Sequence, residues 1–174
     1  MVPPDEVKAG FRGSRPKLRG DANVKPRPHQ PAPADGKPPE AKKQRVLFVC
    51  LGNSCRSQMA EAFARAYGSD VMSVQSAGLT PAVMISPRTK QVLAEMNLNI
   101  DSHFPKGLEI AQVEPFDVVI NMSGHPVDLQ NTRIVPWLVQ DPIGQSEEVY
   151  RNVRQQIEGL VMELILELRA GRLP

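Results

Sequence analysis

Cysteine is scarce in this chain of 174 residues, and both cysteines, Cys50 and Cys55, lie in one short segment. Two cysteines so close in sequence cannot form a disulfide framework that would stabilise a fold. A tetrahedral zinc site would need further ligands, and none flanks the pair. We therefore expect no metal and no cofactor.

Long apolar runs are also missing. None approaches the roughly 18 residues that a membrane-spanning helix needs, and no secretory segment opens the chain. We expect a cytoplasmic protein with no membrane partner, because the reducing cytoplasm keeps thiols free.

The charge is unevenly distributed. Residues 1–45 carry 11 Lys and Arg against 5 Asp and Glu, whereas residues 46–174 carry 10 against 14. The basic charge thus belongs to the N-terminal part, and a basic globular surface for nucleic acid is not indicated. Nine prolines fall within the first 40 residues, without apolar periodicity. This composition predicts a disordered basic tail over residues 1–44, followed by one folded domain over residues 45–174.

The role of this tail stays open. The simplest interpretation is a solvated extension, or a translation start placed too early. A ligand for a proline-binding domain, or a tether to an anionic surface, would have the same composition.

Apolar patterns typical of strands and helices alternate after the tail. The β-branched and aromatic run at 46–49 is typical of a buried strand, and good helix formers follow from Ser57 to Gly68. Similar signals predict strands at 71–76, 116–122 and 133–135, short helices after Pro87 and over 108–113, and a long helix over 147–168. This order predicts an α/β fold with a parallel sheet.

The segment from Cys50 to Ser57 joins the first strand to the first helix. Gly52 and Asn53 tolerate positive φ, so the chain can turn tightly there. Free N–H groups at the start of the helix would make this turn an anion site. A helix N-terminus and a nearby cation favour the thiolate form of a cysteine. Arg56 could also donate two hydrogen bonds to two oxygens of a tetrahedral oxyanion.

The sequence Cys-Leu-Gly-Asn-Ser-Cys-Arg-Ser at 50–57 resembles the C-x5-R-S loop of low-molecular-weight protein tyrosine phosphatases and of the thiol-dependent arsenate reductases that share their fold. The resemblance extends from Arg45 to the end of the chain. It implies a doubly wound, four-stranded parallel sheet with helices on both faces, a phosphotyrosine protein phosphatase I-like fold.

The resemblance also implies the roles of the site residues. Cys50 would be the nucleophile, Arg56 the cation, and Asp141 of Asp141-Pro142 the general acid, which Pro142 would hold in an extended segment. The residues that bind the oxyanion would be Leu51, Gly52, Asn53, Ser54, Cys55 and Ser57.

Polar residues around the thiol have alternative roles. Ser57 could cap the helix, or its hydroxyl could donate to Cys50. Asn53 could simply adopt a left-handed φ, whereas the resemblance implies a polar network that links it to Ser76 and His103. Cys55 could be a small buried side chain, or a resolving thiol that captures oxidised Cys50 in a disulfide.

Three functions follow from this constellation. The leading hypothesis is a cysteine-dependent phosphatase that hydrolyses phosphomonoesters through a cysteinyl-phosphate. The alternative is arsenate reduction by the same cysteine with an external small thiol, favoured by Ser54 and Gln58 and by the lack of aromatic residues near Asp141. The thioredoxin-coupled relatives use two further downstream cysteines, and this chain has none after Cys55. The third is a non-catalytic sensor of an oxyanion such as phosphate or arsenate.

Overall fold

The structure is a computed structural model, and it describes residues 42–174. The strands are β1 (Gln44–Cys50), β2 (Met72–Gly78), β3 (Val118–Asn121) and β4 (Arg133–Pro136). The helices are α1 (Arg56–Tyr67), α2 (Pro87–Ala94), α3 (Ile110–Val113) and α4 (Glu147–Arg169). Apart from residues 42–44, the tail predicted over residues 1–44 lies outside the described residues.

The four strands form one parallel sheet in the order β2-β1-β3-β4. Cys50, the last residue of the central strand β1, is paired with Gly78, the last residue of β2. On the other side, Val49 is paired with Asn121, the last residue of β3. The carboxyl ends of the strands therefore meet at one edge of the sheet, where open α/β sheets bind their ligands.

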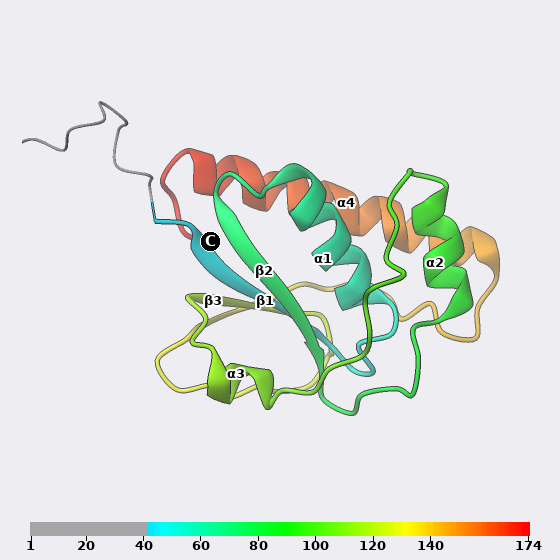
Figure 1. The fold of residues 1–174 in the computed structure, drawn as a ribbon, viewed down its shortest axis with the longest axis horizontal. Helices are drawn as coiled ribbons and strands as arrows, with labels where there is room; N and C mark the ends of the chain where they lie inside the picture. The colour runs from blue at the N-terminus through cyan, green and yellow to red at the C-terminus, as the bar shows by residue number, and fades with distance from the viewer. Residues whose placement is uncertain (1–41) are drawn as a thin grey trace, which may run out of the picture. The chain divides into compact units, whose positions relative to one another are not determined.

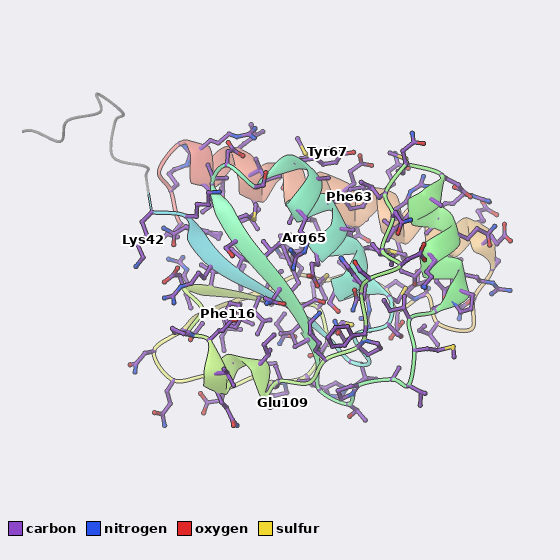
Figure 2. All side chains as sticks on the ribbon, in the orientation of Figure 1. Lys42, Phe63, Arg65, Tyr67, Glu109 and Phe116 are labelled. Atoms are coloured by element: carbon purple, nitrogen blue, oxygen red, sulfur yellow. The ribbon has the colours of Figure 1, made fainter. Side chains whose placement is uncertain are left out.

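Helices cover both faces of the sheet, as predicted (Figure 1). One face packs against α1, α2 and α4, with Phe48 and Phe63 among its fully buried side chains. The other face is covered by α3 and the segments around it, and its core includes Leu47 and Phe116. Figure 2 labels Phe63 and Phe116 on these opposite sides. Each large apolar side chain that is fully buried in these layers contributes about 1.5–3 kcal/mol to folding.

Local sequence signals explain how α4 ends but not how α2 begins. Glycine is the residue that most often follows the end of a helix, and Gly171 does so after α4 with φ +71°, where the N–H of Arg172 bonds to the carbonyl of Glu167. Serine is a common N-cap residue, and Ser86 precedes α2, but it does not cap this helix, because its hydroxyl bonds to Tyr150 Oη of α4 at 3.1 Å. Within residues 42–174, no helix has the length and apolarity to cross a membrane.

Gly78 allows the 50–57 segment to pass directly over the end of β2. A Cβ at this position would lie 2.7 Å from the backbone N of Asn53 and 2.9 Å from the carbonyl carbon of Gly52. Backbone atoms cannot yield as a flexible side chain would. The position therefore tolerates only glycine without displacing the loop.

We predict that Gly78→Ala lowers the free energy of unfolding by about 1–3 kcal/mol, because the new methyl group overpacks against the loop backbone. Gly159→Ala is the matched control. Gly159 lies inside α4, and a methyl group added there would meet nothing within 4 Å, so alanine should stabilise the helix by about 0.5–1 kcal/mol. Urea unfolding of both variants measures this, and equal stability of Gly78→Ala and the wild type would contradict it.

Candidate active site

The loop between β1 and α1 turns its carbonyl groups outward. The carbonyls of Cys50, Leu51 and Gly52 accept hydrogen bonds of 2.8–3.1 Å from the N–H groups of residues 79, 80 and 82. The carbonyl of Ser54 accepts from the N–H of Ser86 at 3.1 Å. No hydrogen bond among the described residues uses an N–H group of residues 51–55 as its donor. The loop thus presents a set of free donors beside the thiol, the arrangement that binds anions.

Asn53 fixes the shape of this loop. It has φ +47°, the left-handed conformation that the sequence predicted for this turn. Its side chain is fully buried and donates from Nδ2 to Ser57 Oγ at 2.9 Å and to Ser76 Oγ at 2.8 Å. Its Oδ1 accepts from the N–H of Lys106 at 2.7 Å. These contacts hold a backbone conformation that costs free energy by itself.

The thiol of Cys50 lies at the start of the loop, with Sγ 3.0 Å from Ser57 Oγ. The cap of α1 is Cys55, and no side chain caps the helix. The interpretation of Ser57 as a helix cap is therefore wrong, and its hydroxyl instead contacts the thiol.

Arg56 and Asp141 meet across the mouth of the loop. Arg56 is almost fully buried and donates from Nη1 to the carbonyl of Met122 at 2.6 Å, while its Nη2 pairs with the carboxylate of Asp141. Its Nε is buried and has no hydrogen-bond partner among the described residues. A buried guanidinium donor without a partner is costly, and a bound anion would satisfy it.

Two tethers hold the segment that carries Asp141. Gln156 of α4 donates to the carbonyl of Leu138 at 3.0 Å, and Arg88 of α2 donates to the carbonyl of Gln145. Within the segment, Asp141 Oδ1 accepts from the N–H of Ile143 at 3.2 Å. The carboxylate therefore stands on a short span fixed at both ends.

These groups line one cavity of about 380 Å³ at the carboxyl edge of the sheet. The residues that line it are Cys50, Leu51, Gly52, Ser54, Cys55, Arg56, Thr80, Ala82, Asp141 and Ile143. The structure thus brings Cys50 and Arg56, at the two ends of one loop, together with Asp141 from a distant segment. No three His, Cys, Asp or Glu side chains in residues 42–174 gather closely enough to hold a metal ion.

Cys55 lines the same cavity but is buried as deeply as Cys50. Both cysteines are free. Burial raises the pKa of the Cys55 thiol to about 12, against an opposing contribution from a hydrogen bond with Thr89. Cys55 is therefore a protonated thiol at neutral pH.

The polar network below the loop is larger than sequence predicted. Ser76 contacts Asn53 directly, but His103 does not, since its Nδ1 bonds to Gln58 Oε1 at 3.0 Å. Gln58 in turn donates to the carbonyl of Asn53 at 3.1 Å. Burial lowers the pKa of His103, which favours its neutral form.

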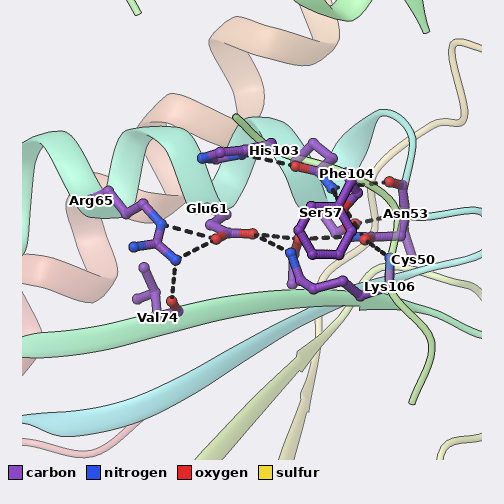
Figure 3. Close-up of polar contacts among 11 residues, drawn as sticks. Cys50, Asn53, Ser57, Glu61, Arg65, Val74, His103, Phe104 and Lys106 are labelled. Atoms are coloured by element: carbon purple, nitrogen blue, oxygen red, sulfur yellow. Dashed lines mark hydrogen bonds and ion pairs between the residues drawn. The ribbon is translucent and has the colours of Figure 1, made fainter. Parts of the chain in front are cut away.

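Sequence reasoning missed three members of this network: Gln58, Glu61 and Lys106. Glu61 is almost fully buried, accepts from Ser76 Oγ at 2.5 Å and lies 3.6 Å from Lys106 Nζ (Figure 3). One signal was present. Ser57, Glu61 and Arg65 recur every four residues and so place a polar stripe along one face of α1.

Known proteins match most of the chain. The family model for low molecular weight phosphotyrosine protein phosphatase matches residues 45–172. A glutaredoxin arsenate reductase of Synechocystis sp. is 35% identical over 130 residues, which cover 72% of this chain and 98% of that protein. Arsenate reductase 1 of Bacillus cereus is 33% identical over 120 residues, covering 66% and 89%. A solved arsenate reductase in the phosphate-binding state has a TM-score of 0.66 at 35% identity and covers 72% and 98%.

These relatives correct the ranking of functions. The sequence favoured phosphomonoester hydrolysis, with arsenate reduction as the alternative. Relatives at 30–35% identity are consistently named arsenate reductases, so the leading hypothesis was wrong. The match over residues 45–172 and the doubly wound sheet show that this chain belongs to the low molecular weight phosphotyrosine protein phosphatase family.

Proposed function

We propose that this protein is an enzyme that reduces arsenate to arsenite, with Cys50 as nucleophile and an external thiol as reductant. The observation that carries the proposal is the cavity in which Cys50, the free N–H groups of the loop and Arg56 face one another. The names of the relatives favour arsenate over a phosphoester as the oxyanion.

Arsenate binding would use the donors already in place. The oxyanion would accept hydrogen bonds from the loop N–H groups and from Arg56 Nε, a buried donor that has no partner among the described residues. Charge-assisted hydrogen bonds from a planar guanidinium are among the stronger and more directional hydrogen bonds in proteins. The binding residues would thus be the predicted set between Leu51 and Ser57.

In the first step, the Cys50 thiolate attacks arsenic. An As–S bond forms, one As–O bond breaks, and the departing oxygen leaves as water. Asp141, beside Arg56 at the cavity, is the candidate proton donor. Its task is modest, because arsenate already carries protonated oxygens at neutral pH.

In the second step, a thiol attacks Cys50 Sγ. An S–S bond forms as the S–As bond breaks, and the bonding electron pair stays on arsenic. Arsenic is thereby reduced from As(V) to As(III) and leaves as arsenite. A second thiol then exchanges with the mixed disulfide, which frees Cys50 and releases the oxidised reductant. The two thiols supply both electrons.

The attacking thiol is the reductant rather than Cys55. Burial raises the pKa of Cys55 to about 12, so this thiol stays almost entirely protonated at pH 7, and the thiolate is the attacking species. No cysteine follows Cys55 in the sequence. The reducing equivalents therefore come from outside the chain.

We predict that Cys50→Ser abolishes arsenite release with any thiol, whereas Cys55→Ser retains at least about half of the wild-type rate with dithiothreitol or glutathione. The assay follows arsenite formed from arsenate. Loss of activity in Cys55→Ser would show that an intramolecular disulfide is required. Tight arsenate binding by the wild type without arsenite release would instead indicate an oxyanion sensor.

Asp141→Asn should slow arsenite release by less than about tenfold, because the leaving oxygen of arsenate needs little help from an acid. Removal of an essential general acid typically costs about 100-fold or more. The same assay, at saturating arsenate and thiol, measures the difference. A loss of about 100-fold would mean that proton donation by Asp141 limits the reaction.

Iodoacetamide should modify the two cysteines very differently. Cys50 should react at pH 7 and be protected by arsenate, whereas Cys55 should stay unmodified up to about pH 10. The pKa of Cys55 is higher in the folded protein than in the unfolded chain, so folding keeps this thiol protonated at a pH where an unfolded thiol ionises. Alkylation of Cys55 therefore begins only as the pH rises toward 12 or when the chain unfolds. Peptide mass spectrometry locates the label, and equal labelling at pH 8 would contradict the prediction.

A further inference from the structure

A chain of hydrogen bonds connects the Cys50 thiol to the buried carboxylate of Glu61 (Figure 3). Cys50 Sγ contacts Ser57 Oγ at 3.0 Å, and Ser57 Oγ accepts from Asn53 Nδ2 at 2.9 Å. The same Nδ2 donates to Ser76 Oγ at 2.8 Å, and Ser76 Oγ lies 2.5 Å from Glu61 Oε2. The chain joins the loop, β2 and the middle of α1.

The chemistry of the groups fixes the direction of every bond in this chain. An ionised carboxylate only accepts, so the Ser76 hydroxyl must donate to Glu61. Ser76 then has only lone pairs to offer Asn53, which donates to it through Nδ2. Because Asn53 also donates to Ser57, the hydroxyl hydrogen of Ser57 is left for Cys50 Sγ.

The orientation of the Asn53 amide decides whether this chain works. If the amide were turned over, Oδ1 would face both serines, and Ser57 would donate to Asn53 instead of to Cys50. Three groups oppose that reversal. Ser76 accepts at the Nδ2 side, and both the N–H of Lys106 and Nε2 of Gln58 donate to Oδ1, at 2.7 Å and 3.1 Å.

Glu61 contacts the side chains of two of these three residues, Ser76 and Lys106. Its Oε2 accepts from Ser76 Oγ and lies 3.6 Å from Lys106 Nζ. Its Oε1 accepts from Arg65 Nη2 at 2.6 Å. Burial raises the pKa of Glu61, but Ser76, Lys106 and Arg65 outweigh it and keep the pKa below its ordinary value. His103 is the other titratable group that faces this carboxylate.

We propose that Glu61 is a positioning residue that, through the Ser76 hydroxyl and the Lys106 side chain, keeps the Asn53 amide in the orientation that lets the Ser57 hydroxyl donate to the Cys50 thiolate. The proposal rests on Cys50 being the nucleophile of the proposed function. Besides Ser57, the charged or titratable groups in or near the Cys50 cavity are Arg56, Asp141 and Cys55, and none of them contacts Glu61.

The test measures the rate of Cys50 alkylation by iodoacetamide from pH 5.5 to pH 9, with no arsenate and no turnover. Glu61→Gln should react about tenfold more slowly than the wild type at pH 6, with the difference closing toward pH 9. The cause is that a thiolate without its hydrogen-bond donor forms only at higher pH. Ser76→Ala should show the same pH-dependent loss, at least about threefold at pH 6.

Two comparisons keep the result interpretable. Glu95→Gln makes the same chemical change in a carboxylate that pairs with Arg151 and Arg154 between α2 and α4, and it should react like the wild type. If Glu61→Gln fails to fold, Ser76→Ala decides alone, because it leaves Glu61 paired with Arg65 and Lys106.

Three results would overturn the proposal. The first is a wild-type alkylation rate at every pH in both variants. The second is slow alkylation of Glu61→Gln together with a wild-type pH profile in Ser76→Ala. The third is a rate that falls by the same factor at all pH values, which would mean reduced access to the thiol. Alkylation does not require arsenate reduction, so a wild type that is alkylated at pH 7 but releases no arsenite would reject the proposed function and leave this test intact.

Discussion

The site depends on one constraint of backbone hydrogen bonding, the outward direction of the carbonyl groups between Cys50 and Ser54. The segment that follows β2 supplies N–H groups to four of these carbonyls, and Gln58 donates to the fifth, that of Asn53. The N–H groups of residues 51–55 donate to no group among the described residues. Gly78 makes this possible, because any side chain there would stand between the loop and β2. The packing of the 50–57 loop against the segment that follows β2 therefore determines the shape of the cavity and the positions of the thiol and of Arg56.

Most of the fold could be predicted from the sequence because its signals are local. The apolar run of β1, the helix formers after it and the glycine at the end of α4 each act within a few residues. Ser86 shows the limit of such reasoning. Its position before a helix suggested a cap, but a partner 64 residues away on α4 takes its hydroxyl. Only tertiary packing decides between these two bonds.

The same limit applies to the site. Cys50, Arg56 and Asp141 could be named because a short motif and an Asp-Pro segment point to a familiar chemistry, and the structure brings them to one cavity. Gln58 and Glu61 could not be assigned contacts, because these depend on the segment around Lys106, far away in sequence. The ranking of phosphatase over reductase failed for a related reason. Both activities need a thiolate, a cradle of N–H groups and a guanidinium, so these residues do not identify the oxyanion.

The segment that carries Asp141 has a consequence for how this site can evolve. It is held at Leu138 by a helix on one side and at Gln145 by a helix on the other. Between those two fixed points, Ile143 projects half-exposed at the entrance, and Gly144 has open space where a side chain would be. Substitutions at Ile143 could therefore reshape the entrance without moving the carboxylate or disturbing the core. A new substrate preference could arise there at little cost in stability.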